Sequence, residues 1–403
     1  MYAYAVPDLH EPTVDTEELR PTRLEVDLDA IADNYRVIAS RVAPARVIPV
    51  LKANAYGHGL VEVARTLEPL GPAWLAVAYL EEALRLRKAG VRAPILVLGG
   101  LVGAQIPRFL EHDISITASS VDKLRAVEEA AAATGRRARV HLKIDTGMER
   151  IGVHWYSAGP LLEASLQCRH VEVEGIFTHL ARADEDDLAP SRQQLERFAE
   201  VLQFYEQRSL PPPVRHVASS GVIERWPECR LDAVRPGVLL YGCGARADTR
   251  PIWPVRPALR WVTRVVFFKV VRPGSPVSYG GTWAPRRMTR IITLPVGYGD
   301  GYMRAMSNRA QVLVRGERRP VVGRICMDQV MVDIDWGTAY NGDEVVLLGS
   351  DGSREIRAEE LAAWADTIPH EVLAAINTRV PRVHRGGVRS VPDDAAHHGP
   401  SRR

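Results

Sequence analysis

The chain has 403 residues, of which 46% are hydrophobic and 25% are charged, so it is long enough for two globular domains with large cores. The formal net charge of +3 gives no reason to expect a nucleic-acid partner. No apolar run is long enough for a membrane span, and the four cysteines form no C-x-x-C pair that would suggest a disulfide framework or a metal site. Since the acidic first residues also lack the apolar segment of a signal peptide, we expect a cytoplasmic enzyme or binding protein.

Between residues 22 and 247, short apolar runs alternate with longer stretches of helical character, and residues 1–21 before them are expected to form a flexible tail. The predicted strands are Arg46–Asn54, Trp74–Leu80, Pro94–Gly99, Ile114–Ser119, Arg139–Thr146, Val171–His179, Val214–Ser219 and Ala233–Tyr241. Strands that alternate with helices indicate parallel βαβ units, and eight units predict an α/β fold with a (β/α)8 barrel of the TIM type. The alternative is an open doubly wound sheet, which would favour a G-x-G-x-x-G motif after the first strand, and none occurs there.

The pattern changes after a proline-rich linker at residues 248–257. The next segment, 258–383, reads as strands joined by glycine turns, and the run 312–323 is typical of a β-hairpin. One helix, Ile356–Asn377, and a short closing strand complete a mostly-β C-terminal domain. Residues 384–403 are expected to be a disordered tail.

Chemically active side chains follow five of the predicted barrel strands. In TIM-type barrels the functional groups lie at the C-terminal ends of the strands, on one face. The candidates there are Lys52, Lys143, Asp145, Arg150, His179, Asp184, Ser219, Ser220, Arg235 and Gly237. Any one of them could be a solvated surface residue or a structural one. That interpretation does not explain five such positions on one rim, nor the placement there of two of only five lysines among 52 basic residues.

A lysine buried at a strand end would have a lowered pKa, because burial disfavours the ammonium form. The resulting neutral amine can form a Schiff base with an aldehyde cofactor. Phosphate sites in this fold favour the loops after strands 7 and 8, where Ser220, Gly237 and Val238 offer a hydroxyl and backbone N–H groups. The sequence therefore predicts pyridoxal phosphate held by Lys52.

Eight motifs resemble those of the alanine racemase family, in family order from residue 22 to 383. They are LKANAYGHG, KIDTGMERIG, GIFTHLARADE, VRPGVLLYG, VSYGGTW, LPVGYGDG, GRICMDQ and RVPRV. The resemblance implies a pyridoxal-phosphate-dependent isomerase that interconverts L- and D-alanine and supplies D-alanine for peptidoglycan. It also implies a cytoplasmic homodimer with shared active sites and a small amino-acid substrate, without a nucleic-acid or membrane partner and without a metal.

The resemblance further implies a role for each matching residue. Lys52 would carry the cofactor and act as one catalytic base, and Tyr279 of the partner subunit would be the second base. Arg235 would bind the pyridine nitrogen with support from His179, and Arg150 would steer the substrate carboxylate. The phosphate would be bound by Tyr56, Ser220, Gly237 and Val238. The remaining implied positions are Lys143 (carbamylated, orienting Arg150), Met327 (substrate carboxylate) and Asp184, Tyr298, Arg304 and Arg324 (substrate access).

Two positions depart from the family pattern. Ser219 stands where Asn is common, and His370 stands where Tyr is usual, near the phosphate and the substrate side chain. A histidine can still donate to a phosphate, so both residues stay candidates for cofactor binding. The alternatives are a serine or broad-specificity racemase and, less favoured, an amino-acid decarboxylase of similar architecture. A non-catalytic cofactor-binding protein is a third possibility, but such proteins lack the β domain that carries Tyr279.

Overall fold

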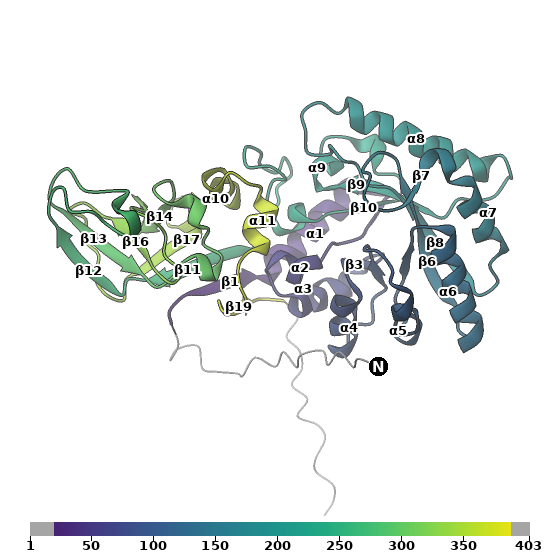
Figure 1. Ribbon diagram of the computed structural model, residues 1–403, viewed down its shortest axis with the longest axis horizontal. Helices are drawn as coiled ribbons and strands as arrows, with labels where there is room; N and C mark the ends of the chain where they lie inside the picture. The colour runs from purple at the N-terminus through teal and green to yellow at the C-terminus, as the bar shows by residue number, and fades with distance from the viewer. Residues whose placement is uncertain (1–19, 388–403) are drawn as a thin grey trace, which may run out of the picture. The chain divides into compact units, whose positions relative to one another are not determined.

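Eight parallel strands in the N-terminal part of the chain form a closed ring through their pairing; Figure 1 shows this part of the chain in purple to teal. The computed structural model describes residues 20–387. The ring strands are β2 (Arg46–Val47), β3 (Leu75–Val77), β4 (Ile95–Val97), β5 (Ile116–Ala118), β6 (Ala138–Asp145), β8 (Val171–Phe177), β9 (Val214–Ser219) and β10 (Ala233–Arg235). Six strands pair in the order β2-β10-β9-β8-β6-β5, and β3 pairs with β4. Parallel bridges between Val50 and Ala76 and between Leu96 and Ser115 join the two groups, which confirms the predicted (β/α)8 barrel.

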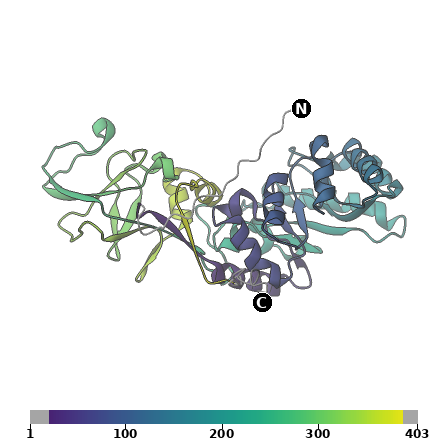
Figure 2. The same cartoon turned by 90° about the horizontal axis from the view of Figure 1, so that it is seen from below.

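Helices cover the outside of these strands. They are α1 (Leu28–Val42), α3 (Leu60–Leu67), α4 (Leu80–Lys88), α5 (Ile106–Glu111), α6 (Val121–Thr134), α7 (Gly159–Gln167), α8 (Ala189–Glu206) and α9 (Ser220–Ile223). In α6, Leu124, Val127 and Ala131 are buried at helical spacing, and Ser120 caps the first turn by accepting from the Lys123 N–H. Figures 1 and 2 show the helices of this region around the strands. No helix within residues 20–387 combines the length and the hydropathy needed to cross a membrane.

Six of the eight predicted strands are shorter than expected, the first and the last most of all. The first, predicted as Arg46–Asn54, ends as a regular strand at Val47 and gives way to a tight turn, α2 (Lys52–Tyr56). The last, predicted to reach Tyr241, stops at Arg235 and is followed by the 3-10 turn η5 (Val238–Tyr241). Pro236 explains this end, because proline has no N–H with which to continue the ladder.

A second region consists almost entirely of antiparallel strands. They are β11 (Leu259–Arg264), β12 (Phe267–Val271), β13 (Thr289–Leu294), β14 (Gln311–Val314), β15 (Glu317–Pro320), β16 (Val330–Asp333), β17 (Glu344–Asp351) and β18 (Arg354–Ile356). The larger sheet has the order β15-β14-β17-β11-β1-β19, with β18 on β17 and with β1 (Arg23–Asp27) and β19 (Arg382–Arg385) at one side. A three-stranded sheet, β12-β13-β16, completes it. The predicted hairpin is confirmed as β14 and β15, which pair around Arg315–Gly316.

The described residues fall into two compact units. The barrel unit comprises residues 25–259, 357–376 and 384–387, and the β unit comprises residues 20–24, 260–356 and 377–383. The tails proposed at 1–21 and 384–403 lie outside the described residues, except for residues 20–21 and 384–387. Of these, residues 384–385 belong to β19.

The single helix predicted at Ile356–Asn377 is wrong, because two short helices form there. The first, α10 (Ala358–Ala365), ends at Asp366 with a left-handed φ of 57°. The second, α11 (Pro369–Ala374), starts with proline at its first position, which suits a helix start but not a helix interior. Both helices belong to the barrel unit. A Cβ at Gly57 would lie 2.4 Å from the carbonyl oxygen of Leu373 in α11, so only glycine allows this close packing.

Candidate active site

A cavity of about 700 Å³ opens at the C-terminal ends of the barrel strands. Every residue that lines it belongs to the barrel unit. The lining includes these residues singled out in the sequence: Lys52, Tyr56, Lys143, Arg150, His179, Asp184, Ser219, Ser220, Arg235, Gly237 and His370. The fold thus collects strand ends that are far apart in the chain, as the barrel topology requires.

Lys52 begins a turn of unusual backbone geometry. Ala53, Asn54 and Ala55 have φ values of 54–55°, in the left-handed region, which costs about 1–2 kcal/mol per residue outside glycine. Hydrogen bonds hold the turn: the Ala53 N–H donates to Glu82 Oε1 at 2.7 Å, and the Asn54 side chain accepts from the Leu60 N–H at 2.9 Å. Strain that is held in this way is typical of functional sites.

The Lys52 amine faces an environment that disfavours its charged form. Burial by the cavity walls lowers the pKa of Lys52, and the positive charge of Arg150 lowers it further, against a smaller opposing effect of Glu82. A larger fraction of this lysine is therefore the neutral amine at a given pH than for a solvated lysine. The neutral amine is the form that acts as a nucleophile or a base.

Arg235 lies at the cavity wall and is held by backbone carbonyl groups. Its guanidinium donates to the carbonyls of Thr178, His216 and Val217 at 2.7–2.9 Å, and the residue is only 4% exposed. Burial lowers the pKa of Arg235 to about 9, so the group still carries its charge at neutral pH. His179 Nδ1 lies 3.4 Å from Arg235 Nη2, and burial followed by the charge of Arg235 lowers the pKa of His179 well below its usual value.

Two buried histidines continue from Arg235 into the barrel interior. His216 Nδ1 is 2.8 Å from Arg235 Nη1, His216 Nε2 is 2.9 Å from His141 Nδ1, and His141 Nε2 is 3.6 Å from the Glu174 carboxylate. Burial and then Arg235 lower the pKa of His216 well below its usual value, so its imidazole is neutral. Since a guanidinium only donates, His216 Nδ1 must accept from Arg235. In this series of side chains, each N–H therefore points away from Arg235 and toward Glu174.

Lys143 and Arg150 lie on the strand β6 side of the cavity. Lys143 is buried with its Nζ 4.5 Å from the centre of the Phe177 ring. Burial and then the charge of Arg235 lower the pKa of Lys143 well below its usual value, which favours its neutral amine. The turn that presents Arg150 is organised by Asp145, whose carboxylate accepts the backbone N–H groups of residues 147–150 at 2.8–3.1 Å.

Tyr56, Ser220 and Gly237 form a polar corner of the cavity. Ser220 Oγ accepts the N–H groups of Gly237 at 2.9 Å and Leu239 at 3.2 Å, which leaves its own proton to donate to a ligand. Burial raises the pKa of Tyr56, so the phenol keeps its proton as a donor. A Cβ at Gly237 would lie 2.6 Å from Tyr56 Oη, so a larger residue would fill this corner. Val238 follows as a buried residue.

His370 borders the same corner from helix α11. Its ring centre is 5.9 Å from that of Tyr56. Burial and then the charge of Lys52 lower the pKa of His370 to about 4, so the imidazole is neutral. Its Nδ1 is buried and has no hydrogen-bond partner among residues 20–387. A buried nitrogen without a partner is costly, and His370 also lines the cavity.

The remaining sequence candidates lie in the β unit. Tyr279 and Met327 line a groove of about 930 Å³ and are 70% and 52% exposed. Ser278, before Tyr279, has a φ of 65°, and its hydroxyl donates to the Arg324 carbonyl at 2.5 Å. The residues expected along the substrate access path in this unit are Tyr298, Arg304 and Arg324. Lys52 and Tyr279 therefore belong to different units of one chain.

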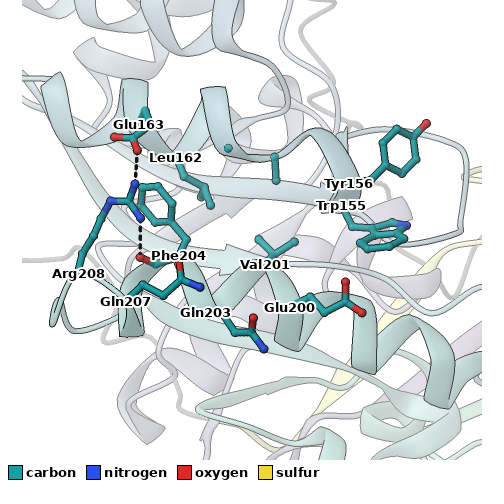
Figure 3. A pocket seen from close by; sticks show the side chains of 12 residues that line it. Trp155, Tyr156, Leu162, Glu163, Glu200, Val201, Gln203, Phe204, Gln207 and Arg208 are labelled. Carbon is teal, nitrogen blue, oxygen red and sulfur yellow. Dashed lines mark hydrogen bonds and ion pairs between the residues drawn. The ribbon is translucent and has the colours of Figure 1, made fainter.

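Another cavity, of about 600 Å³, lies between η3 (Trp155–Ser157) and the helices α7 and α8 (Figure 3). Two of its charged groups are already engaged, because Arg208 pairs with Glu163 and lies 3.8 Å over the Phe204 ring. No barrel strand end contributes to its lining. It offers none of the chemistry of the first cavity.

Comparisons with known proteins agree with this arrangement. Residues 26–245 match the family model "Alanine racemase, N-terminal domain", and residues 258–384 match "Alanine racemase, C-terminal domain". The chain is 43% identical over 380 residues to alanine racemase 2 of Caldanaerobacter subterraneus subsp. tengcongensis, covering 93% of this chain and 98% of that protein.

Solved structures give the same result. Alanine racemase from the D-cycloserine-producing Streptomyces lavendulae superposes with a TM-score of 0.87 and 38% identity, covering 92% of this chain and 98% of that one. Alanine racemase from Bartonella henselae, solved with covalently bound pyridoxal phosphate, has a TM-score of 0.81 and 28% identity over 91% of this chain and 100% of that one. With both family models and relatives of this similarity spanning nearly its whole length, the chain belongs to the alanine racemase family.

Proposed function

We propose that this protein is a pyridoxal-phosphate-dependent racemase that interconverts L- and D-alanine and so supplies D-alanine for peptidoglycan. The observation that carries the proposal is the cavity in which Lys52, an amine of lowered pKa, shares one space with Arg235 and with the polar corner of Tyr56, Ser220 and Gly237. The family membership supports the same reaction. The four cysteines are free, as is usual in a reducing compartment, and we assign the reaction to the cytoplasm.

The residues of the cavity fit pyridoxal phosphate. The hydroxyls of Tyr56 and Ser220, the imidazole of His370 and the backbone beside Gly237 suit a phosphate. We assign the backbone of Val238, which follows Gly237, to the same role. Ser219 lines the same end of the cavity. At the other end, a guanidinium that only donates suits an unprotonated pyridine nitrogen. The neutral amine of Lys52 suits the aldehyde.

Two bases divide the proton transfer. When bound at Lys52, pyridoxal phosphate would supply electron withdrawal that makes the Cα proton of the substrate acidic. Racemisation removes that proton from one face and returns a proton to the other. Lys52 Nζ holds or donates the proton on one face, and we assign the other face to the phenol oxygen of Tyr279 of the partner subunit. The lowered pKa of Lys52 favours its work as a base near neutral pH.

Arg235 orients the ring nitrogen and controls its protonation. Its backbone acceptors and His216 fix the guanidinium in place, with His179 beside it. Because Arg235 stays charged at neutral pH, it does not deliver its proton to the ring nitrogen. This moderates the electron withdrawal and favours return of the proton to Cα over side reactions.

Arg150 is proposed to bind the substrate carboxylate, and the backbone of Met327 of the partner subunit to meet it from the other chain. The neutral amine of Lys143 is suited to carbamylation: its Nζ forms a bond to the carbon of CO₂ and releases one N–H proton, which leaves an anion beside Arg150. Native mass spectrometry would detect the added CO₂, and Lys143→Ala would remove it. Asp184, together with Tyr298, Arg304 and Arg324 of the partner subunit, would line the access path.

The shared site requires a homodimer. The support is that Tyr279 and Met327 are exposed beside a groove of the β unit, a surface that a second copy would cover. Coexpression of Lys52→Ala with Tyr279→Phe tests this directly. In a mixed dimer one site carries both changes and the other carries neither. Random pairing would therefore restore about a quarter of wild-type activity, whereas bases from one chain would give no restoration.

A serine or broad-specificity racemase is the second candidate, and His370 is the observation that favours it. His370 lines the cavity at a position where Tyr is usual in the family, and a neutral imidazole has one nitrogen that accepts the hydroxyl of a serine side chain. The matched variant is His370→Tyr, which restores the residue usual in the family. A serine activity that depends on His370 would fall in this variant, while the alanine activity would not.

A panel of L-amino acids, assayed for D-enantiomers by chiral chromatography, tests the proposed function. The holoenzyme should convert L-alanine to D-alanine until both are equal, and faster than it converts any other amino acid. Release of an amine and CO₂ would identify a decarboxylase instead. Cofactor binding without any product from the panel would contradict an enzymatic role.

A further inference from the structure

Gln194, on the buried face of helix α8, connects two of the loops that form the cavity. Its Nε2 donates to Thr146 Oγ1 at 3.2 Å and to the His179 carbonyl at 3.1 Å. Its Oε1 accepts the Ala181 N–H at 2.8 Å. Thr146 follows β6, and residues 178–181 follow β8, so a single side chain bridges the ends of two neighbouring strands.

These bonds require an amide. Gln194 is only 4% exposed, so a group left without a partner there would cost about 1–3 kcal/mol. The N–H of Ala181 needs an acceptor, while the carbonyl of His179 needs a donor. A carboxylate would place an oxygen against the His179 carbonyl, and an aliphatic side chain would leave both backbone groups unpaired.

The bridge continues through two hydroxyls toward Arg235. Thr146 Oγ1 lies 2.8 Å from Thr178 Oγ1, and the carbonyl of Thr178 accepts from Arg235. One helical turn after Gln194, the Arg197 guanidinium donates to the Thr146 carbonyl at 2.9 Å. The loop after β6 is thereby held by α8 on one side and by the carboxylate of Asp145 on the other.

Both bridged loops carry a residue of the cavity. The loop from Thr146 leads in four residues to Arg150, and the loop after β8 begins with His179, whose own carbonyl Gln194 binds. Gln194 itself does not line the cavity. Its influence on chemistry must therefore pass through the positions of these two side chains.

We propose that Gln194 is a positioning residue for racemisation: it holds the Arg150 loop and the His179 loop in register so that the substrate carboxylate meets a preset guanidinium. This inference rests on the proposed function. Displacements of about 1 Å in such supporting groups are known to cost up to about 100-fold in rate. The step most affected is the binding of substrate by Arg150, rather than the attachment of the cofactor at Lys52.

The test is the variant Gln194→Glu, which keeps the shape and removes the donors. The matched control is Gln193→Glu, the same change at the exposed neighbour on the same helix. In the holoenzyme we expect Gln194→Glu to raise KM for alanine between about 10-fold and 100-fold. We expect a smaller fall in kcat and an unchanged visible spectrum of the bound cofactor. The control should match the wild type.

An unchanged KM in Gln194→Glu, with only a lower Tm, would overturn the proposal and leave Gln194 a purely structural residue. If that variant does not fold, Thr146→Val decides, because it removes the hydroxyl on Nε2 and keeps the volume. It should raise KM in the same direction by a smaller factor, and an unchanged KM would again overturn the proposal. A wild-type enzyme that racemises no amino acid would refute the proposed function instead, so the two failures are distinguishable.

Discussion

The mouth of the barrel and the groove around Tyr279, which the proposed active site combines, differ in how far protein surrounds their functional groups. In the barrel, burial lowers the pKa values of four groups, namely Lys52, Lys143, His179 and Arg235. Neighbouring cations add to the effect at the first three. In the β unit, Tyr279 stands 70% exposed after a residue with a strained backbone. The pKa values of the barrel groups are thus set within their own unit. The β unit leaves the phenol of Tyr279 open, so under the proposed function the partner subunit would provide its surroundings.

The largest effect is expected at the amine of the barrel. Lys52→Ala should abolish the visible absorbance of covalently bound cofactor and lower racemisation at least about 1,000-fold, because both the attachment point and one base are lost. Spectroscopy of the purified protein and a chiral assay measure the two effects. Lys88→Ala, at an exposed position of α4, is the control and should change neither. An unchanged cofactor spectrum in Lys52→Ala would show that Lys52 does not bind the cofactor covalently.

The exposed phenol should matter for one half of the reaction. Tyr279→Phe is expected to slow racemisation about 100-fold, since one general base is lost. Lys52 remains, so one enantiomer of alanine should still exchange its Cα hydrogen with deuterated water without inversion. NMR of each enantiomer measures this exchange. Tyr156→Phe, which changes another exposed phenol, should have no effect, and an equal fall in exchange for both enantiomers would contradict two separate bases.

The barrel should also lose stability where its charge is buried. Arg235→Met leaves the carbonyls of Thr178, His216 and Val217 without their donor, which should cost about 3 kcal/mol in the free energy of unfolding. Denaturant unfolding measures it. Arg286→Met, at an exposed site in the β unit, should stay within about 0.5 kcal/mol. An equal loss in the free energy of unfolding for Arg235→Met and Arg286→Met would contradict this difference in stability between the two regions.

The smallest effect is a shift in pH dependence. Burial and then Arg150 lower the pKa of Lys52, so cofactor attachment should rise with pH through that lowered pKa as the neutral amine forms. Arg150→Gln removes a cation, which raises the pKa of Lys52 and should move the midpoint of attachment to higher pH. Stopped-flow absorbance over a pH series measures this midpoint. A midpoint that moves to lower pH would show that Arg150 does not act on Lys52 through its charge.

The barrel itself was predictable because its strands are short apolar runs between amphipathic helices, a pattern that depends on local sequence. The lengths of the elements were not. The strand after Ala233 stops at Pro236, and the helix predicted across residues 356–377 breaks between Asp366 and Pro369. In both places a proline marks the boundary of the element, but the hydrophobic pattern continues across it.

The candidate side chains at the strand ends were found because the barrel topology brings such ends together. The groups that hold them were missed, because His216, Thr178 and Gln194 touch the site only through other residues. For His141 the sequence did contain a signal. It lies two residues before Lys143 in β6, so the two side chains share a face of the strand. No local pattern links Gln194 to Thr146, since 48 positions separate them.

The return of α10 and α11 to the barrel unit has a consequence for dissecting this enzyme. The chain passes from one unit to the other and back, so a cut at the linker 248–257 would not yield two autonomous modules. A truncated barrel would lose the backbone that packs on Gly57, and the Glu359 carboxylate that accepts the Gly244 N–H at 2.7 Å. Chimaeras that exchange the β unit between relatives must therefore leave residues 357–376 with the barrel.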